Sequence, residues 1–189
     1  MNRMSKVATA CCSVVMLAGV LPAVAQSGMN DASGKASMAD KKFVKEALEG
    51  GMAEVQLGQL AAQKGNSDDV KKFGQKMVDD HSKMGDDLRP VASQIGVTPP
   101  TSVSMKDKAL MTKLEGLSGD AFDKAYIQAM VKDHKMDLAE FKKEASSGMD
   151  PAVKEQASKG SEVISQHLQM IEQIAQAHHV MAGSSASSM

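Results

Sequence analysis

Residues Phe73–Ile95 read "FGQKMVDDHSKMGDDLRPVASQI" and show the clearest helical pattern in the chain. Large side chains recur in this stretch at steps of four and three, which is typical of the buried face of a helix in a bundle. The series consists of Phe73, Met77, His81, Met84, Leu88, Val91 and Ile95. The stretch therefore predicts an amphipathic helix that carries an imidazole inside its apolar stripe.

Outward from this stretch, the same helical period recurs and no segment alternates as a half-buried strand would. Long helices are predicted at 40–64, 68–96, 119–147 and 151–178, with a short helix at 105–117. Gly65 suits a left-handed helix end, while Ser67, Ser118 and Asp150 are predicted helix caps. Pro99 and Pro100 impose a loop. The sequence thus predicts an all-α fold, a four-helix bundle with a long, partly helical connection between its second and third helices.

The first residues have the form of a secretory signal. Arg3 and Lys6 precede an apolar run, and "AVA" at 23–25 resembles a signal-peptidase site. We expect residues 1–25 to be removed near Ala25, leaving a periplasmic or secreted protein. Residues 26–39 are predicted to be a flexible leader, 40–178 the bundle domain, and 179–189 a disordered tail.

Composition excludes several functions. Both cysteines, Cys11 and Cys12, lie in the predicted signal, so thiol chemistry and cysteine-bound metals are excluded from the mature chain. Loss of the signal leaves a net charge of −3, without a basic run, and the chain has 1 Tyr, 4 Phe and no Trp. This composition argues against a nucleic-acid partner. No later run is apolar enough to span a membrane, and a homo-oligomer is left open.

Each predicted long helix carries one ionisable residue in its apolar stripe: Glu54, His81, His134 and His167. At about 1.5 Å per residue, Glu54 and His81 lie roughly 16 and 24 Å from the Gly65 turn. By the same rise, His134 and His167 lie roughly 21 and 28 Å from the Gly148 turn. These mid-helix depths predict that the four side chains meet at one level.

Three imidazoles and a carboxylate suit iron, manganese, zinc or copper, so the four residues form a candidate metal or small-ligand site. Asp80, Asp133 and Asp137 are candidates for orienting the imidazoles. The alternative is a buried polar network that fixes helix register and binds no ligand. Methionines also lie one turn from the histidines, which could indicate copper, although methionine more often fills a core that lacks aromatic residues.

The motif Met-Val-x-Asp-His occurs at 77–81 and again at 130–134. Together with "AEVQLGQLAAQKG" and "ISQHLQMIEQ", it resembles the bacterial family described as domain of unknown function 4142, over about residues 39–178. The resemblance implies a ferritin-like fold and no established activity. The family positions that match are Glu54, His81, His134 and His167.

The sequence departs from the di-iron proteins of the ferritin-like class, which place Glu three residues before His on two helices. The corresponding residues here are Val78, Val131 and Ile164. Iron oxidation, manganese-catalase chemistry and iron storage are therefore disfavoured, and a non-enzymatic role is favoured over an enzymatic one, which stays open. The leading hypothesis is an exported bundle that binds a metal or small ligand in an envelope or stress role. A structural or partner-binding bundle and a metal-dependent redox enzyme are the alternatives.

Overall fold

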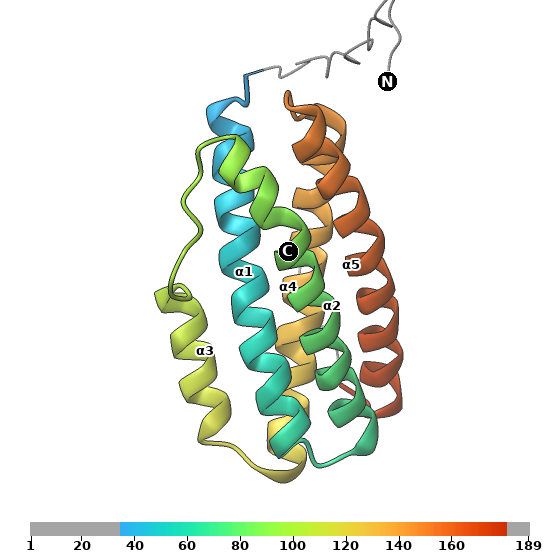
Figure 1. The fold of residues 1–189 in the computed structure, drawn as a ribbon. Helices are drawn as coiled ribbons and strands as arrows, with labels where there is room; N and C mark the ends of the chain where they lie inside the picture. The colour runs from blue at the N-terminus through green and yellow to red at the C-terminus, as the bar shows by residue number, and fades with distance from the viewer. Residues whose placement is uncertain (1–34, 181–189) are drawn as a thin grey trace, which may run out of the picture. The chain divides into compact units, whose positions relative to one another are not determined.

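The computed structural model describes residues 35–180, and within that range the chain forms five α-helices and no strand (Figure 1). The helices are α1 (Met38–Lys64), α2 (Asp68–Gln94), α3 (Met105–Glu115), α4 (Gly119–Ser147) and α5 (Pro151–Ala177). The all-α prediction is confirmed, and every helix begins and ends within two residues of its predicted place. No helix in the described range combines the length and the apolarity that a membrane crossing needs.

The predictions for the chain ends are only partly covered by residues 35–180. The signal at 1–25, most of the leader at 26–39 and most of the tail at 179–189 lie outside the described residues. Where the leader prediction does overlap them, α1 already begins at Met38. The cause is a capping box that sequence inspection missed, in which the Asp40 amide donates to Ser37 Oγ and the Ser37 amide donates to Asp40.

The four long helices pair as two hairpins, α1 with α2 and α4 with α5. Contacts of α2 with α5 and of α1 with α4 join the hairpins, and the short α3 packs against α1 and α4. Gly58 and Gly74 allow a close approach of α1 and α2. A Cβ atom at Gly58 would lie 2.6 Å from the Gly74 carbonyl oxygen, so no larger residue fits there without a shift.

Apolar side chains fill the space between the helices in two clusters. The first includes Leu57, Phe73, Met77, Tyr126, Met130 and Ile171. The second includes Phe43, Val44, Leu88, Val91, Val153 and Ala157. On each long helix, the predicted ionisable residue lies between the stretches that feed the two clusters. A polar layer therefore divides the apolar core.

Ser67, Ser118 and Gly65 stand at the helix ends predicted for them, but without the predicted geometry. The Ser67 and Ser118 side chains make no capping hydrogen bond. Gly65 has φ −48°, outside the left-handed region, and its amide donates to the Ala61 carbonyl. The Asp150 cap is confirmed, because its carboxylate accepts from the Ala152 and Val153 amides.

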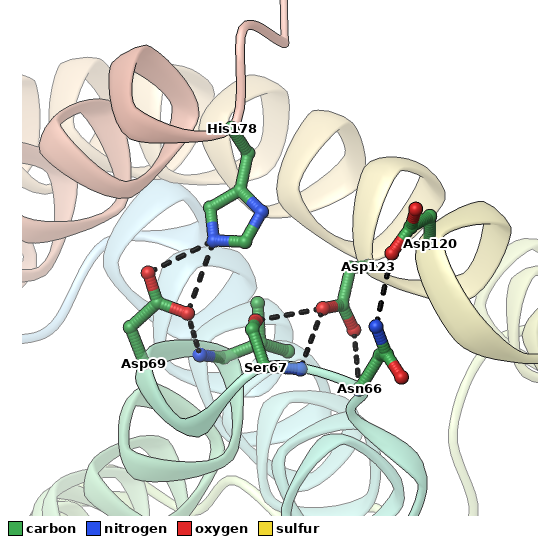
Figure 2. Close-up of polar contacts among 7 residues, drawn as sticks. Asn66, Ser67, Asp69, Asp120, Asp123 and His178 are labelled. Atoms are coloured by element: carbon green, nitrogen blue, oxygen red, sulfur yellow. Dashed lines mark hydrogen bonds and ion pairs between the residues drawn. The ribbon is translucent and has the colours of Figure 1, made fainter.

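Ser67 has a different partner because Asp123 of α4 holds the α1–α2 turn (Figure 2). The Asp123 carboxylate accepts from the Asn66 amide at 2.8 Å, the Ser67 amide at 2.9 Å and Ser67 Oγ at 2.7 Å. Nearby, a ring nitrogen of His178 lies 2.9 Å from the Asp69 carboxylate. These contacts fasten one end of the first hairpin to the second.

Asp40 of α1 does the same for the α4–α5 turn. Its carboxylate accepts from the Met149 amide at 2.9 Å and from the Asp150 amide at 3.3 Å. Each hairpin thus carries, near its start, a buried aspartate that binds two consecutive amides in the turn of the other hairpin.

This reciprocity reflects an internal structural repeat with an offset of 83 residues. Asp40 corresponds to Asp123, and α2 corresponds to α5 from its first residue to its last. The ends of the hairpins also correspond. Gly96 and His179 have φ of 72° and 51°, and the amide that follows each donates over 2.8 Å to an alanine carbonyl five residues back.

The repeated Met-Val-x-Asp-His motif does not follow this repeat, because its copies are 53 residues apart. It places His81 on α2 and His134 on α4, which are not equivalent helices. The two imidazoles therefore enter the interior from different structural positions.

Candidate metal centre

Three histidines from three helices meet in the polar layer. The ring centroids lie 6.0 Å apart for His81 and His134, 5.3 Å for His81 and His167, and 5.6 Å for His134 and His167. One ring nitrogen from each lies within 4.8 Å of those of the other two. All three rings are buried, with exposures of 5%, 1% and 0% for His81, His134 and His167.

Hydrogen bonds determine which ring nitrogens are available. His134 Nδ1 lies 3.0 Å from the Met130 carbonyl oxygen, and because a carbonyl only accepts, Nδ1 carries the proton. His167 Nε2 lies 2.7 Å from the Asp80 carboxylate and donates to it. The remaining nitrogens, His134 Nε2 and His167 Nδ1, have no hydrogen-bond partner, and neither has His81 Nε2.

The surroundings keep these imidazoles neutral. Burial, followed by the neighbouring imidazoles, lowers the pKa of His81 to about 3, and burial lowers the pKa of His134 to about 3. Burial also lowers the pKa of His167, although the Asp80 carboxylate opposes the shift. A neutral imidazole with a free lone pair is the form that binds a metal ion.

Asp80 is the only one of the three predicted orienting aspartates that bonds a histidine of the site. Its partner is His167 of α5 and not the adjacent His81, because Asp80 points across the α2–α5 interface. Although burial opposes ionisation, hydrogen bonds from Lys76 and His167 hold the pKa of Asp80 below its ordinary value. The carboxylate thus stays ionised and accepts a hydrogen bond from the imidazole N–H.

Glu54 reaches the same polar layer but does not join the group formed by the three histidines. Its Oε1 is 3.9 Å from His134 Nδ1, the nitrogen that already bonds the Met130 carbonyl. Its carboxylate groups closely with Asp133 and Asp137 and not with the three histidines as a set. Burial, followed by the charges of Asp133 and Asp137, raises the pKa of Glu54 well above its ordinary value.

The aromatic side of the layer contains a polar group that sequence inspection missed. The Phe73 ring lies 6.2 Å from the rings of both His134 and His167. Behind it, the buried Tyr126 hydroxyl has no hydrogen-bond partner. Burial, followed by the charge of Glu54, raises the pKa of Tyr126 well above its ordinary value. In the sequence, Tyr126 is visible only as a member of the helical apolar stripe at 119–147, a pattern that indicates a core position and no polar role.

The methionines around the histidines have separate roles. Met77 and Met130 are fully buried in the first apolar cluster, as the core-filling alternative predicts. Met170 packs partly buried against that cluster, and Met84 lines a cavity.

That cavity has a volume of about 340 Å³ and lies between α1, α2, α4 and α5. Glu54 and His81 line it, together with apolar residues such as Phe43, Met84 and Ile164. Charged side chains, including Lys83 and Lys159, also line it and are largely exposed. It therefore gives a small solute a route to the polar layer.

Gly50 and Gly51 line this cavity from the middle of α1. A Cβ atom at Gly50 would meet nothing within 4 Å, and one at Gly51 would lie 3.9 Å from His81 Nδ1. Glycine inside a helix costs about 1 kcal/mol relative to alanine, and no close packing requires it here. The pair instead leaves space in front of His81.

Comparison with known proteins agrees with the fold. The family described as "Domain of unknown function (DUF4142)" matches residues 25–174, which confirms the resemblance seen in the sequence. No curated protein matches the chain.

Three solved structures are similar in fold. A DUF305 fragment from Deinococcus radiodurans has 13% identity and a TM-score of 0.67, over 75% of this chain and 98% of its own. A DUF305 protein from Streptomyces coelicolor, described as secreted, has 13% identity and a TM-score of 0.65, over 77% and 97%. A two-domain Anabaena variabilis protein with DJ-1/ThiJ/PfpI-like and ferritin-like domains has 12% identity and a TM-score of 0.58, over 82% and 41%.

Proposed function

Since the chain belongs to the DUF4142 family, we propose that it is an exported, ferritin-like four-helix bundle that binds a transition-metal ion through His81, His134 and His167. The observation that carries this proposal is the set of three buried ring nitrogens without a hydrogen-bond partner. Buried polar atoms normally find partners, and a neutral imidazole nitrogen that lacks one is suited to a metal.

The residues around the three rings support the proposal. Metal-binding histidines commonly donate their second ring N–H to a carboxylate or a backbone carbonyl, as His167 and His134 do here. Imidazole ligands suit zinc, copper and iron. With three protein nitrogens, a metal ion would keep a coordination position for water or for a small ligand that enters through the cavity.

Export is supported by the signal-like residues 1–25 and by the fold shared with a Streptomyces protein described as secreted. The ferritin-like assignment is supported by the Anabaena domain and by the pairing of α1, α2, α4 and α5. A periplasmic or secreted protein of this kind would hold or buffer metal outside the cytoplasm. Metal-dependent redox chemistry is the third hypothesis.

The alternative, a polar network that only stabilises the bundle, predicts that the buried nitrogens pair with one another or with other groups. The unpartnered nitrogens of His81, His134 and His167 are unfavourable for such a network, because each buried unsatisfied group costs about 1–3 kcal/mol.

The test is to titrate Zn, Cu and Fe ions into wild type, His81→Ala and His178→Ala while recording the melting temperature. A metal that binds only the folded protein raises its melting temperature. Wild type and His178→Ala should respond to at least one metal, because His178 lies outside the site, whereas His81→Ala should lose most of the response. Equal responses from wild type and His81→Ala to every metal would contradict the proposal.

Asp80→Asn separates metal binding from packing. The amide cannot hold His167 as the carboxylate does, so metal affinity should fall about 10- to 100-fold. Asp79→Asn, one residue earlier on the exposed face of α2, is the matched control and should leave affinity unchanged. Calorimetric titration of the metal-free proteins measures both.

A further inference from the structure

A second group of ligand atoms lies beside the three histidines. One carboxylate oxygen each from Glu54, Asp133 and Asp137 lies within 4.8 Å of those of the other two. Glu54 comes from α1, and the two aspartates come from α4, so the group spans the interface between the hairpins.

Glu54 shows that this group is more than a solvated acidic face. Its side chain is 2% exposed, and both of its oxygens are buried without a hydrogen-bond partner. A buried carboxylate without a donor or a counter-charge is unfavourable, since it has lost its water and gained nothing in return. A cation that reaches Glu54 from the side of the two aspartates would satisfy both oxygens.

The internal repeat supports the same assignment. Glu54 and Asp137 are separated by the offset of 83 residues that relates the hairpins. Two acidic side chains at equivalent positions therefore approach each other across the interface. This arrangement presents oxygen ligands from both halves to one point.

We propose that Glu54, Asp133 and Asp137 bind a hard divalent cation such as Mn²⁺ or Ca²⁺ at a site adjacent to, and separate from, the three histidines. Such cations prefer carboxylate, carbonyl and water oxygens, whereas three imidazoles favour softer metals. This site does not depend on metal binding by the histidines.

Lys106 of α3 modulates the site. Its Nζ lies 3.3 Å from Asp133 Oδ1, and its side chain is 66% exposed. The ammonium therefore neutralises the outer part of the group without entering the buried part around Glu54. A divalent cation would compete with Lys106 for Asp133, which makes α3 a covering element that sets the affinity of the site.

The experiment titrates Mn²⁺ into metal-free protein and follows free and bound ion by electron paramagnetic resonance. Wild type and His81→Gln should bind a single Mn²⁺ with equal affinity, because His81 is not a ligand of this site. Asp137→Asn and Glu54→Gln, which keep the side-chain shapes, should each weaken binding at least about tenfold. Circular dichroism confirms that each variant keeps its helices.

Lys106→Met and Lys108→Met form a matched pair on α3. Removal of the Lys106 charge should tighten Mn²⁺ binding by about two- to fivefold, the size of an exposed ion pair, whereas the exposed Lys108 should have no effect. Unchanged affinity in both Glu54→Gln and Asp137→Asn would overturn the proposal, and so would loss of Mn²⁺ binding in His81→Gln. Failure of the histidine site would appear separately, as a missing Zn²⁺ or Cu²⁺ response with Mn²⁺ binding intact.

Discussion

Glu144 and Asp40 are two neighbouring carboxyl groups, on α4 and at the start of α1. Their pKa values are shifted in opposite directions. Although burial opposes ionisation, amide donors at Met149 and Ser37 lower the pKa of Asp40 to about 2. Burial, followed by the neighbouring Asp40 carboxylate, raises the pKa of Glu144 to about 7. In the folded protein, Asp40 is therefore charged while Glu144 still holds its proton at mildly acidic pH.

These shifts predict how stability depends on pH. The contribution of Glu144 is fully present below its ordinary value of 4.5 and is lost as pH rises through about 7, because the unfolded chain releases that proton more readily. The contribution of Asp40 is present above 3.8 and is lost as pH falls towards about 2. The pair therefore favours folding most near pH 4.

Glu144→Gln tests the alkaline side of this dependence. Glutamine stays neutral, so the melting temperature of wild type should fall relative to that of the variant between pH 4.5 and about 7. Glu115→Gln, at an exposed position on α3, should run parallel to wild type over the same range. Parallel curves for wild type and Glu144→Gln would contradict the assignment.

Single residues also mark how far the site could be predicted. Helical spacing placed Glu54, His81, His134 and His167 at one depth, because the rise per residue is fixed. It could not show that Glu54 turns towards Asp133 and Asp137, or that Asp80 bonds His167. Those partners are chosen by rotamers and by helix rotation in the packed core, which sequence spacing does not specify.

At the scale of elements, α1 contains two kinds of interior glycine with opposite roles. Gly58 faces the Gly74 carbonyl of α2 at a distance that excludes a Cβ atom, whereas Gly50 faces open space. The first kind is required by helix packing. A glycine of the second kind lowers the stability of α1, and no close packing requires it.

Gly50→Ala should therefore stabilise the protein by about 0.5–1 kcal/mol, through the higher helix propensity of alanine. Gly74→Ala, which would place its Cβ atom 2.7 Å from the Gly58 carbonyl oxygen, should destabilise the protein by about 1–3 kcal/mol. Urea unfolding midpoints measure both changes. Two shifts of the same sign would show that the two glycines do not differ as described.

The helix boundaries could be predicted from glycine, proline and the apolar period of the sequence. The hydrogen bonds of the capping side chains were harder to predict. Asp150 caps α5 as predicted, because its carboxylate accepts from the Ala152 and Val153 amides of its own helix. Ser67 does not cap α2, because its hydroxyl donates to the Asp123 carboxylate, an acceptor that comes from α4. The Ser67 hydroxyl therefore bonds a carboxylate 56 residues away in place of the nearby amides that an N-cap would bind.

At the scale of the whole molecule, Asp40 and Asp123 connect the hairpins at opposite ends of α1, which is about 40 Å long. Each aspartate satisfies two amides of a turn that would otherwise be partly buried without partners. The two contacts share no residue, so they act as independent fastenings between the same two units.

Asp40→Ala and Asp123→Ala should each destabilise the protein by about 2–3 kcal/mol, the loss expected for hydrogen bonds to a charged group. The double variant should show the sum of the two effects, since sites this far apart add. Asp120→Ala, which removes only an exposed bond to the Asn66 side chain, should cost about 0.5 kcal/mol or less. A double variant no less stable than either single variant would contradict the independence of the two contacts.

The repeat of 83 residues gives the cavity a structural origin. Gly50 and Gly51 stand at the positions of the first hairpin that correspond to Asp133 and His134 in the second. The second hairpin thus carries an acid and an imidazole where the first hairpin carries two residues without side chains. The cavity beside His81 therefore opens where the first hairpin has no side chains to match the carboxylate and imidazole of the second, and at the proposed metal site it is the place where a small exogenous ligand would enter.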